Sequence, residues 1–234
     1  MTQHDRSCYS SIMSTSALST HARILHQGLA LLSQAGLAGV TLGVLAERVG
    51  LSKSGLFAHF RSKEGVQLGI LTYMGHCARQ QVIEPAMRAA EGLPRLQALV
   101  EHWLGWAPRA GLPGGCPVAA ALFELDDVDG PVRQQVLAME REWRDLLTKM
   151  VRQAITLGHF RPDLDVEQFV WELCGIYLSH HAAQRFLRAT DADARAHTAF
   201  QALLARAQPP RVRRRRGQRA KRPLVRRAGE SLST

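Results

Sequence analysis

Hydroxyl and lysine side chains stand at the starts of successive short helices between Thr41 and Lys63. Thr41 and Ser52 are preferred helix N-cap residues. A helix N-terminus presents free backbone N–H groups, and Thr41 adds a hydroxyl, so this position can hold a phosphate. Lys53 is the one exposed position of the helix after Ser52 with the donors for direct contact with a guanine edge. These residue types offer recognition of a nucleic acid by helix ends.

Two short helices and the start of a third must position these side chains. Apolar residues recur at helical spacing over residues 41–48, and Gly50 ends that helix. A second helix is predicted over residues 52–60, and a third begins at Lys63. Two short helices joined by such a sharp turn are typical of a helix-turn-helix. The apolar positions that define the pattern, core residues in any fold, are Leu42, Leu45, Ala46, Val49, Leu56 and Phe60.

The segment TLGVLAERVG, followed in register by SKSGLFAHFRSKE, resembles the DNA-binding domain of the TetR/AcrR family of bacterial transcriptional regulators. The match is detailed over about residues 24–71 and loose beyond. The resemblance implies that Lys53, Ser54 and Gly55 meet bases or the adjacent backbone, and that the others face phosphates. The DNA-contacting positions so implied are Thr41, Lys53, Ser54, Gly55, Phe57, His59 and Lys63.

Two of these positions, Phe57 and His59, also allow an interpretation other than a phosphate contact. The family more often has Tyr where this chain has Phe57, and Phe keeps the ring contact but cannot hydrogen-bond a phosphate. His59 also fits an ordinary surface histidine. Base readout by this helix is therefore thin, and specificity is expected to depend on dimer spacing and DNA shape as well as on Lys53.

The formal charge of +10 is spread unevenly along the chain. Residues 21–81 hold six Lys or Arg and two Glu, whereas residues 82–210 hold thirteen Lys or Arg and sixteen Asp or Glu. Residues 211–234 hold ten Lys or Arg and one Glu. The helix-turn-helix region is thus the folded part with a positive balance, as expected of a DNA-binding unit on a body that does not touch DNA.

Four segments are predicted. Residues 1–19, rich in Ser and Thr, are expected to be disordered, and Met13 is an alternative translation start. Residues 20–72 form the DNA-binding domain, here called the head, and residues 73–208 form an effector-binding and dimerisation domain, here called the body. Residues 209–234 form a basic disordered tail, either an arm on DNA phosphates or a solvated segment of little consequence.

No stretch alternates with period two, so the fold class expected is all-α, with about nine helices. The short apolar helix over residues 116–125 is expected at the centre of the body, and APRAGLPGG before it as a loop. Pro85 is expected to end or kink the helix from Lys63. Further helices are predicted from Thr20 as N-cap to about Gln34, from Lys63 to about Val82, from Leu93 to about Trp106, from Pro131 to about Leu157, from Asp165 to about Leu187, and from Asp191 or Asp193 to Ala207.

The family resemblance implies a homodimer. The last two long helices would form a four-helix bundle with those of a second subunit. Dimerisation would space the recognition helices by about 34 Å or slightly more, to match a pseudo-palindromic operator in double-stranded DNA.

An effector pocket for an unidentified small molecule is expected inside the body. Each of its candidate residues also fits an ordinary core or surface role. His180 and His181 are adjacent and point apart on a helix, and the four cysteines show no CxxC spacing, so neither a metal site nor a cofactor is predicted. The pocket candidates are His102, Trp103, Trp106, Cys116, Phe123, Trp143, Tyr177 and His180, with His181 as a further polar anchor.

The function expected from these observations is a TetR-like regulator, an effector-released repressor rather than an enzyme. A helical enzyme is the weaker alternative, because the sequence shows no nucleophile with an attendant base, no paired carboxylates and no phosphate-cradling glycine loop. A second alternative is a non-specific DNA-binding protein that binds mainly through its basic tail. With no apolar run that could span a bilayer, we expect a cytoplasmic protein associated with the nucleoid.

Overall fold

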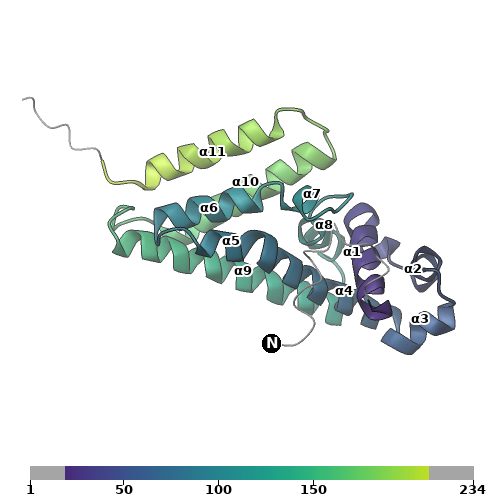
Figure 1. Ribbon diagram of the computed structural model, residues 1–234. Helices are drawn as coiled ribbons and strands as arrows, with labels where there is room; N and C mark the ends of the chain where they lie inside the picture. The colour runs from purple at the N-terminus through teal and green to yellow at the C-terminus, as the bar shows by residue number, and fades with distance from the viewer. Residues whose placement is uncertain (1–18, 211–234) are drawn as a thin grey trace, which may run out of the picture.

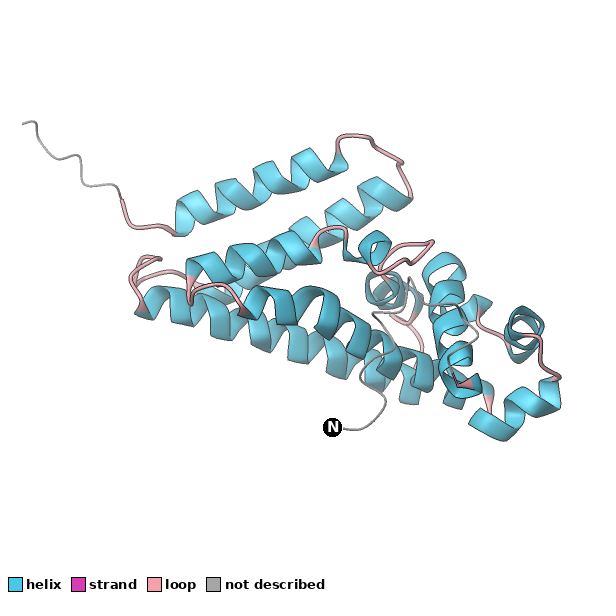
Figure 2. Ribbon diagram, in the orientation of Figure 1, coloured by secondary structure: helices cyan, strands magenta, loops and turns pink. Residues whose placement is uncertain are grey.

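The computed structural model describes residues 19–210, and every regular element among them is helical (Figures 1 and 2). The predicted all-α fold class is confirmed, and α5 and α7 are single turns beyond the predicted set. The elements are α1 (Thr20–Gly39), α2 (Leu42–Val49), α3 (Lys53–Phe60), α4 (Lys63–Ala78), the π-helical turn η2 (Arg79–Ile83), α5 (Glu84–Met87), α6 (Leu93–Trp103), α7 (Trp106–Arg109), α8 (Pro117–Glu124), α9 (Pro131–Thr156), α10 (Val166–Arg185) and α11 (Ala192–Ala207).

Side-chain caps start the helices of the head. The Thr41 hydroxyl accepts from the Val44 amide at 3.2 Å, and the Ser52 hydroxyl accepts from the Gly55 amide at 3.0 Å. Ser62 caps α4 in the same way. One predicted cap was wrong by a residue, because Ser19, not Thr20, accepts from the α1 amide of Ala22. The three-helix head then closes as α1 packs on α2 and α4.

Helix α1 contains a kink at Gly36. Its φ of 69° and ψ of −175° are non-helical, and a positive φ favours glycine. The first piece therefore ends close to the predicted end near Gln34, and a short second piece carries α1 on to Gly39. The kink leaves the first amides of the second piece without intrahelical partners.

The helix that joins head and body was predicted to reach about Val82 and to end or kink at Pro85. It continues through η2 into α5, so Pro85 does not end it. In η2 the Glu84 amide donates to the Arg79 carbonyl, five residues back. Pro85 lacks an N–H, so it cannot make the next α-helical bond, and the widened turn accommodates it.

Two predictions for the body were wrong. The segment after α6 is not all loop, because Trp106 begins the turn α7. Helix α8 does not lie at the centre of the body but between α1 and α9 (Figure 1). Its apolar faces divide between head and body, and the outward Phe123 is 66% exposed. An almost fully apolar helix here covers a junction rather than filling a centre.

The remaining long helices start where predicted. Pro131 opens α9, Asp165 caps α10 by accepting from the Gln168 amide, and α11 begins after Asp191. Helices α10 and α11 pack side by side, far from α3 (Figure 1). No helix within residues 19–210 combines the length and hydropathy that a membrane crossing requires.

The domain boundaries stay predictions. The proposed limit between residues 72 and 73 falls inside α4, and one continuous core of buried side chains runs through head and body. The terminal segments 1–19 and 209–234, with their predicted disorder, the alternative start at Met13 and the basic tail, lie almost entirely outside the described residues.

Candidate nucleic-acid interface and ligand cavity

The candidate DNA-binding residues lie together on α3 and on the first residues of its neighbours. Lys53, Ser54 and His59 are exposed on α3, and Lys63 is exposed at the start of α4. Gly55 is half-buried, since it closes onto its capping serine. Helix α3 stands at the end of the molecule away from α11 (Figure 1). A duplex can approach this end without meeting the body.

Hydroxyl groups on this face keep donors available. The Thr41 oxygen accepts from the Val44 amide, which leaves its O–H free to donate to a phosphate. Ser52 and Ser54 lie 3.0 Å apart, oxygen to oxygen, so one donates to the other. Together with Lys53, these groups give the face donors for a polyanion.

Two aromatic side chains on α3 are placed differently. Phe57 is 51% exposed, a large apolar ring in solvent where the face would meet DNA. His59 belongs to a ring cluster, with its centroid 6.3 Å from that of His21 and 6.4 Å from that of Phe60. His21 stacks on Phe60 at 5.0 Å. His59 therefore lies beside two other rings while remaining exposed.

A cavity of about 550 Å³ lies in the body between α4, η2, α6, α8, α9 and α10. Its aromatic wall is ordered by ring contacts. Trp103 stacks on Tyr177 with centroids 4.1 Å apart and meets Trp143 edge-on at 4.7 Å. The Trp106 indole N–H donates to the Tyr177 hydroxyl at 3.0 Å. The predicted pocket residues that line this cavity are Trp103, Trp106, Cys116, Trp143 and Tyr177.

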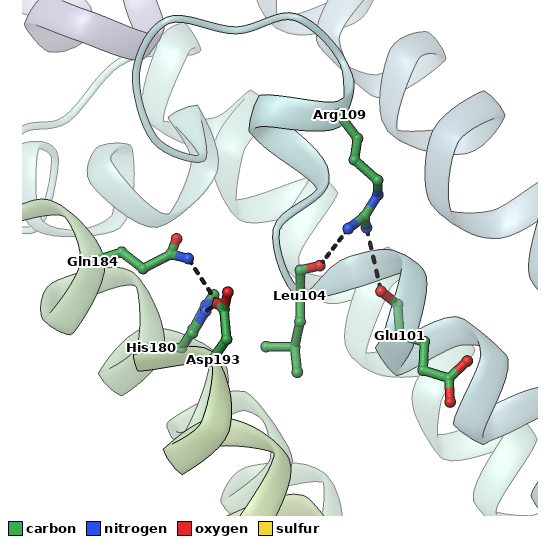
Figure 3. Close-up of polar contacts among 6 residues, drawn as sticks. All are labelled: Glu101, Leu104, Arg109, His180, Gln184 and Asp193. Carbon is green, nitrogen blue, oxygen red and sulfur yellow. Dashed lines mark hydrogen bonds and ion pairs between the residues drawn. The ribbon is translucent and has the colours of Figure 1, made fainter. Parts of the chain in front are cut away.

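Three predicted pocket residues lie elsewhere. Phe123 points into solvent, and His102 is half-buried outside the cavity, where its carbonyl accepts from Arg109. His180 is 4% exposed and its Nε2 lies 2.7 Å from Asp193 Oδ1 (Figure 3). His180, like the predicted anchor His181, lines a second hollow on the other side of Tyr177.

The electrostatics of the cavity favour neutral contacts. Burial raises the pKa of the Tyr177 hydroxyl well above its ordinary value, so it stays protonated. Burial also raises the pKa of the Cys174 thiol to about 11, which keeps it an unreactive thiol. The buried indole nitrogen of Trp143 has no hydrogen-bond partner among the described residues. The wall can therefore surround an apolar body and offer a donor to a ligand oxygen.

One part of the wall, which comes from the connecting helix, was not among the predicted pocket residues. Met74 of α4 and Arg79, Val82 and Ile83 of η2 line the cavity. Their signal was present as apolar residues on more than one face of this helix, followed by Pro85. Within residues 19–210 no group of three or more His, Cys, Asp or Glu side chains is placed to share a metal ion.

Known proteins agree with this arrangement. A structure of a TetR transcriptional regulator from Chloroflexus aurantiacus J-10-FL matches with a TM-score of 0.71 and 25% identity, over 80% of this chain and 92% of that one. A TetR-family regulator from Cytophaga hutchinsonii matches at 0.69 and 22%, over 82% and 98%. AibR, solved with isovaleryl coenzyme A and operator DNA, matches at 0.61 and 22%, over 77% and 97%.

Among curated proteins no significant match is found. The family assignment comes from two adjoining matches that together follow the head and the body. Residues 24–68 match the bacterial regulatory proteins of the tetR family, and residues 92–200 match the tetracyclin repressor-like C-terminal domain. A helix-turn-helix on a hollow helical body, with both halves matched in this order, means that the chain belongs to the TetR family of transcriptional regulators.

Proposed function

We propose that this regulator is a homodimeric repressor, released from a pseudo-palindromic operator when a small molecule occupies the cavity in the body. The observation that carries the proposal is the course of α4. Its first residue, Lys63, stands at the candidate DNA face, and Met74, three turns later, lines the cavity. A ligand that reshapes the cavity therefore acts on the helix that orients the head.

A surface stripe on α10 supports dimerisation. Trp171 is 66% exposed and Phe186 is 86% exposed, and the small residues Gly175 and Ala182 lie exposed between them. Spacings of four and seven place these residues on one helix face. Two exposed aromatic rings with small residues between them are typical of a protein contact, and α11 beside them would complete a four-helix bundle with a second subunit.

Release would be a shift between two populations. The effector must bind more tightly to the conformation in which the two heads no longer match successive grooves. The relative AibR holds an acyl coenzyme A and operator DNA, which supports a small-molecule effector for this fold. We further propose that the protein acts in the cytoplasm, at the nucleoid, and carries out no enzymatic reaction.

Lysine substitutions test the head. Genomic fragments bound by the full-length protein would be selected and the operator identified. Lys53→Ala should then weaken operator binding by roughly 10- to 100-fold, because it removes the base donor. Lys63→Ala should weaken binding to all sequences and reduce the salt slope by about 1. Lys149→Ala, at an exposed position of α9, is the matched control.

The control separates loss of DNA contacts from a general effect of removing a lysine. Lys149→Ala should bind like the parent protein. If Lys53→Ala and Lys63→Ala bind a selected operator as tightly as the parent, the DNA-binding face is misassigned.

A second candidate function rests on the basic tail, with ten Lys or Arg in residues 211–234. A chain that binds DNA mainly through this segment would bind operator and random DNA alike. Deleting residues 209–234 and measuring affinity against salt separates the two. An unchanged salt slope and an operator preference that persists would exclude a tail-driven binder.

A further inference from the structure

A second hollow of about 440 Å³ lies beside the aromatic cavity, and we call it the outer chamber. It is bounded by the segment from Gly105 to Cys116 and by the C-terminal end of α10 with the turn that follows. Trp106, Cys116 and Tyr177 line both spaces, so these three side chains form the partition between them.

The lining of the outer chamber contributes positive charge and no negative charge. Arg185 and Arg188 line it, and its lining includes no Asp or Glu. Within residues 19–210 neither guanidinium has a hydrogen-bond acceptor or an ion-pair partner. The nearby carboxylate of Asp193 is already engaged, since His180 and Gln184 both contact its Oδ1, at 2.7 and 2.8 Å (Figure 3).

The imidazole of His181 adds a neutral polar group. Burial, followed by the charge of Arg185, lowers its pKa below the ordinary value of 6.5, so it is uncharged at neutral pH. The positive charge of the chamber therefore comes from the two arginines. Guanidinium groups are always charged and present forked donors that fit carboxylates and phosphates.

Glycine lets these groups reach the backbone of the opposite wall. A Cβ on Gly115 would lie 2.6 Å from His181 Cε1 and 2.9 Å from Arg185 Cγ. The close approach is therefore possible only without a side chain at this position. The Gly115 amide also donates to the carbonyl of Ser33 in α1, at 3.1 Å, so this wall is fastened to the head.

We propose that the outer chamber is an oxyanion site, and that the effector is an amphipathic organic anion whose apolar part fills the aromatic cavity. The ligand would cross the partition at Trp106 and Tyr177, where the single indole-to-hydroxyl hydrogen bond must open or bend aside. This inference rests on the proposed effector-binding role of the body. A carboxylate and a phosphate ester share the required chemistry.

Direct binding to the full-length protein without DNA tests the site. Decanoate, decyl phosphate and decanol, each below its micelle concentration, would be titrated by calorimetry and by tryptophan fluorescence. The parent protein should bind at least one of the two anions roughly 10-fold or more tightly than decanol, because charged hydrogen bonds to arginine are added. The preferred anion identifies the head group.

Paired variants assign the effect to the two arginines. Combined Arg185→Gln and Arg188→Gln should lower the affinity for the anion to that for decanol and leave decanol binding unchanged. Combined Arg185→Lys and Arg188→Lys should retain part of the anion preference. Arg141→Gln, at an exposed position of α9 outside both spaces, is the matched control and should behave like the parent protein.

Three results would overturn the proposal. They are equal binding of decanol and the anions by the parent protein, an unchanged anion preference in the double glutamine variant, and failure of both anions to bind. Operator binding by the same samples separates this failure from that of the proposed function. If the parent protein binds its operator and no anion, the regulator stands and the oxyanion site falls.

Discussion

The head is joined to the body in two places that are built in opposite ways. The first is α4, a continuous backbone helix that widens into the π-turn η2 where it borders the cavity. The second is a set of hydrogen bonds between α1 and both ends of α8, which we call the clamp. The first connection is a continuous backbone, whereas the second consists of hydrogen bonds that either form or break.

The clamp uses the kink in α1. Gly36 leaves the amides of Leu37 and Ala38 without helical partners, and the carboxylate of Glu124 accepts from both, with Leu37 N to Oε2 at 2.7 Å. This is an N-cap supplied by a side chain 87 residues away. At the other end of α8, Ser33 accepts from two successive amides in the segment before it.

Both connections touch the space that the effector would fill. Val118 and Leu122 of α8 line the cavity from one side, and Val82 of η2 lines it from another. The cavity therefore borders both connections between head and body.

The largest effect should come from a methyl group in the clamp. A Cβ on Gly114 would lie 1.8 Å from the Ser33 carbonyl oxygen, a backbone atom that cannot turn aside. Gly114→Ala should therefore lower the free energy of unfolding by about 1–3 kcal/mol or more. Urea unfolding of the purified protein measures this change.

The matched control for Gly114 is a glycine in the other connection. A Cβ on Gly75 in α4 would meet only Met139 Cε, at 3.5 Å, which is an ordinary contact. Gly75→Ala should leave stability unchanged or raise it by up to about 1 kcal/mol, because alanine favours the helix. Equal destabilisation by both substitutions would show that the clamp is no tighter than α4.

A smaller effect is expected at the other end of the clamp. Glu124→Gln replaces one acceptor oxygen by an NH2 group that faces an amide donor, so one bond is lost and the other is weakened. The free energy of unfolding should fall by about 1 kcal/mol. Hydrogen exchange of the Leu37 and Ala38 amides should accelerate.

The control for Glu124 is Glu101→Gln, since the Glu101 carboxylate is exposed on α6 (Figure 3). Glu101→Gln should change stability by less than about 0.5 kcal/mol. If Glu124→Gln leaves amide exchange in α1 at the parent rate, the carboxylate does not hold the kinked helix, and the clamp depends on the Ser33 hydrogen bonds alone.

The sequence was sufficient for the features that depend on near neighbours. Thr41, Ser52 and Asp165 cap helices through bonds to residues three positions ahead, a spacing that can be read directly. The aromatic residues that surround the cavity were also named, because large apolar side chains at helical spacing point inward. Their role as an effector site stays a prediction.

The clamp could not be predicted in this way. Glu124 and Leu37 are 87 residues apart, and nothing local to either shows that they meet. Glu124 follows a run of apolar residues that favoured the centre of the body, and the same run explains why Phe123 was placed in the pocket. A short apolar helix with one acidic end is equally typical of a junction, and only the packing distinguishes the two.

The smallest effect should be the response of α1 to acid. His26 lies in α1, where its buried Nδ1 has no hydrogen-bond partner among the described residues, and burial lowers its pKa below the ordinary value of 6.5. The folded state therefore binds fewer protons than the unfolded state. Stability conferred by neutral His26 is complete well above pH 6.5 and falls as the pH drops through 6.5 toward the folded pKa.

His26→Gln should reduce the loss of stability between about pH 7.5 and about pH 5.5, measured by urea unfolding at each pH. The loss should not vanish, because burial also lowers the pKa of His181 in α10. His76→Gln, at an exposed position of α4, is the control and should keep the parental loss. If His76→Gln reduces the loss as much as His26→Gln does, burial of the His26 imidazole is not the cause of the acid-dependent loss of stability.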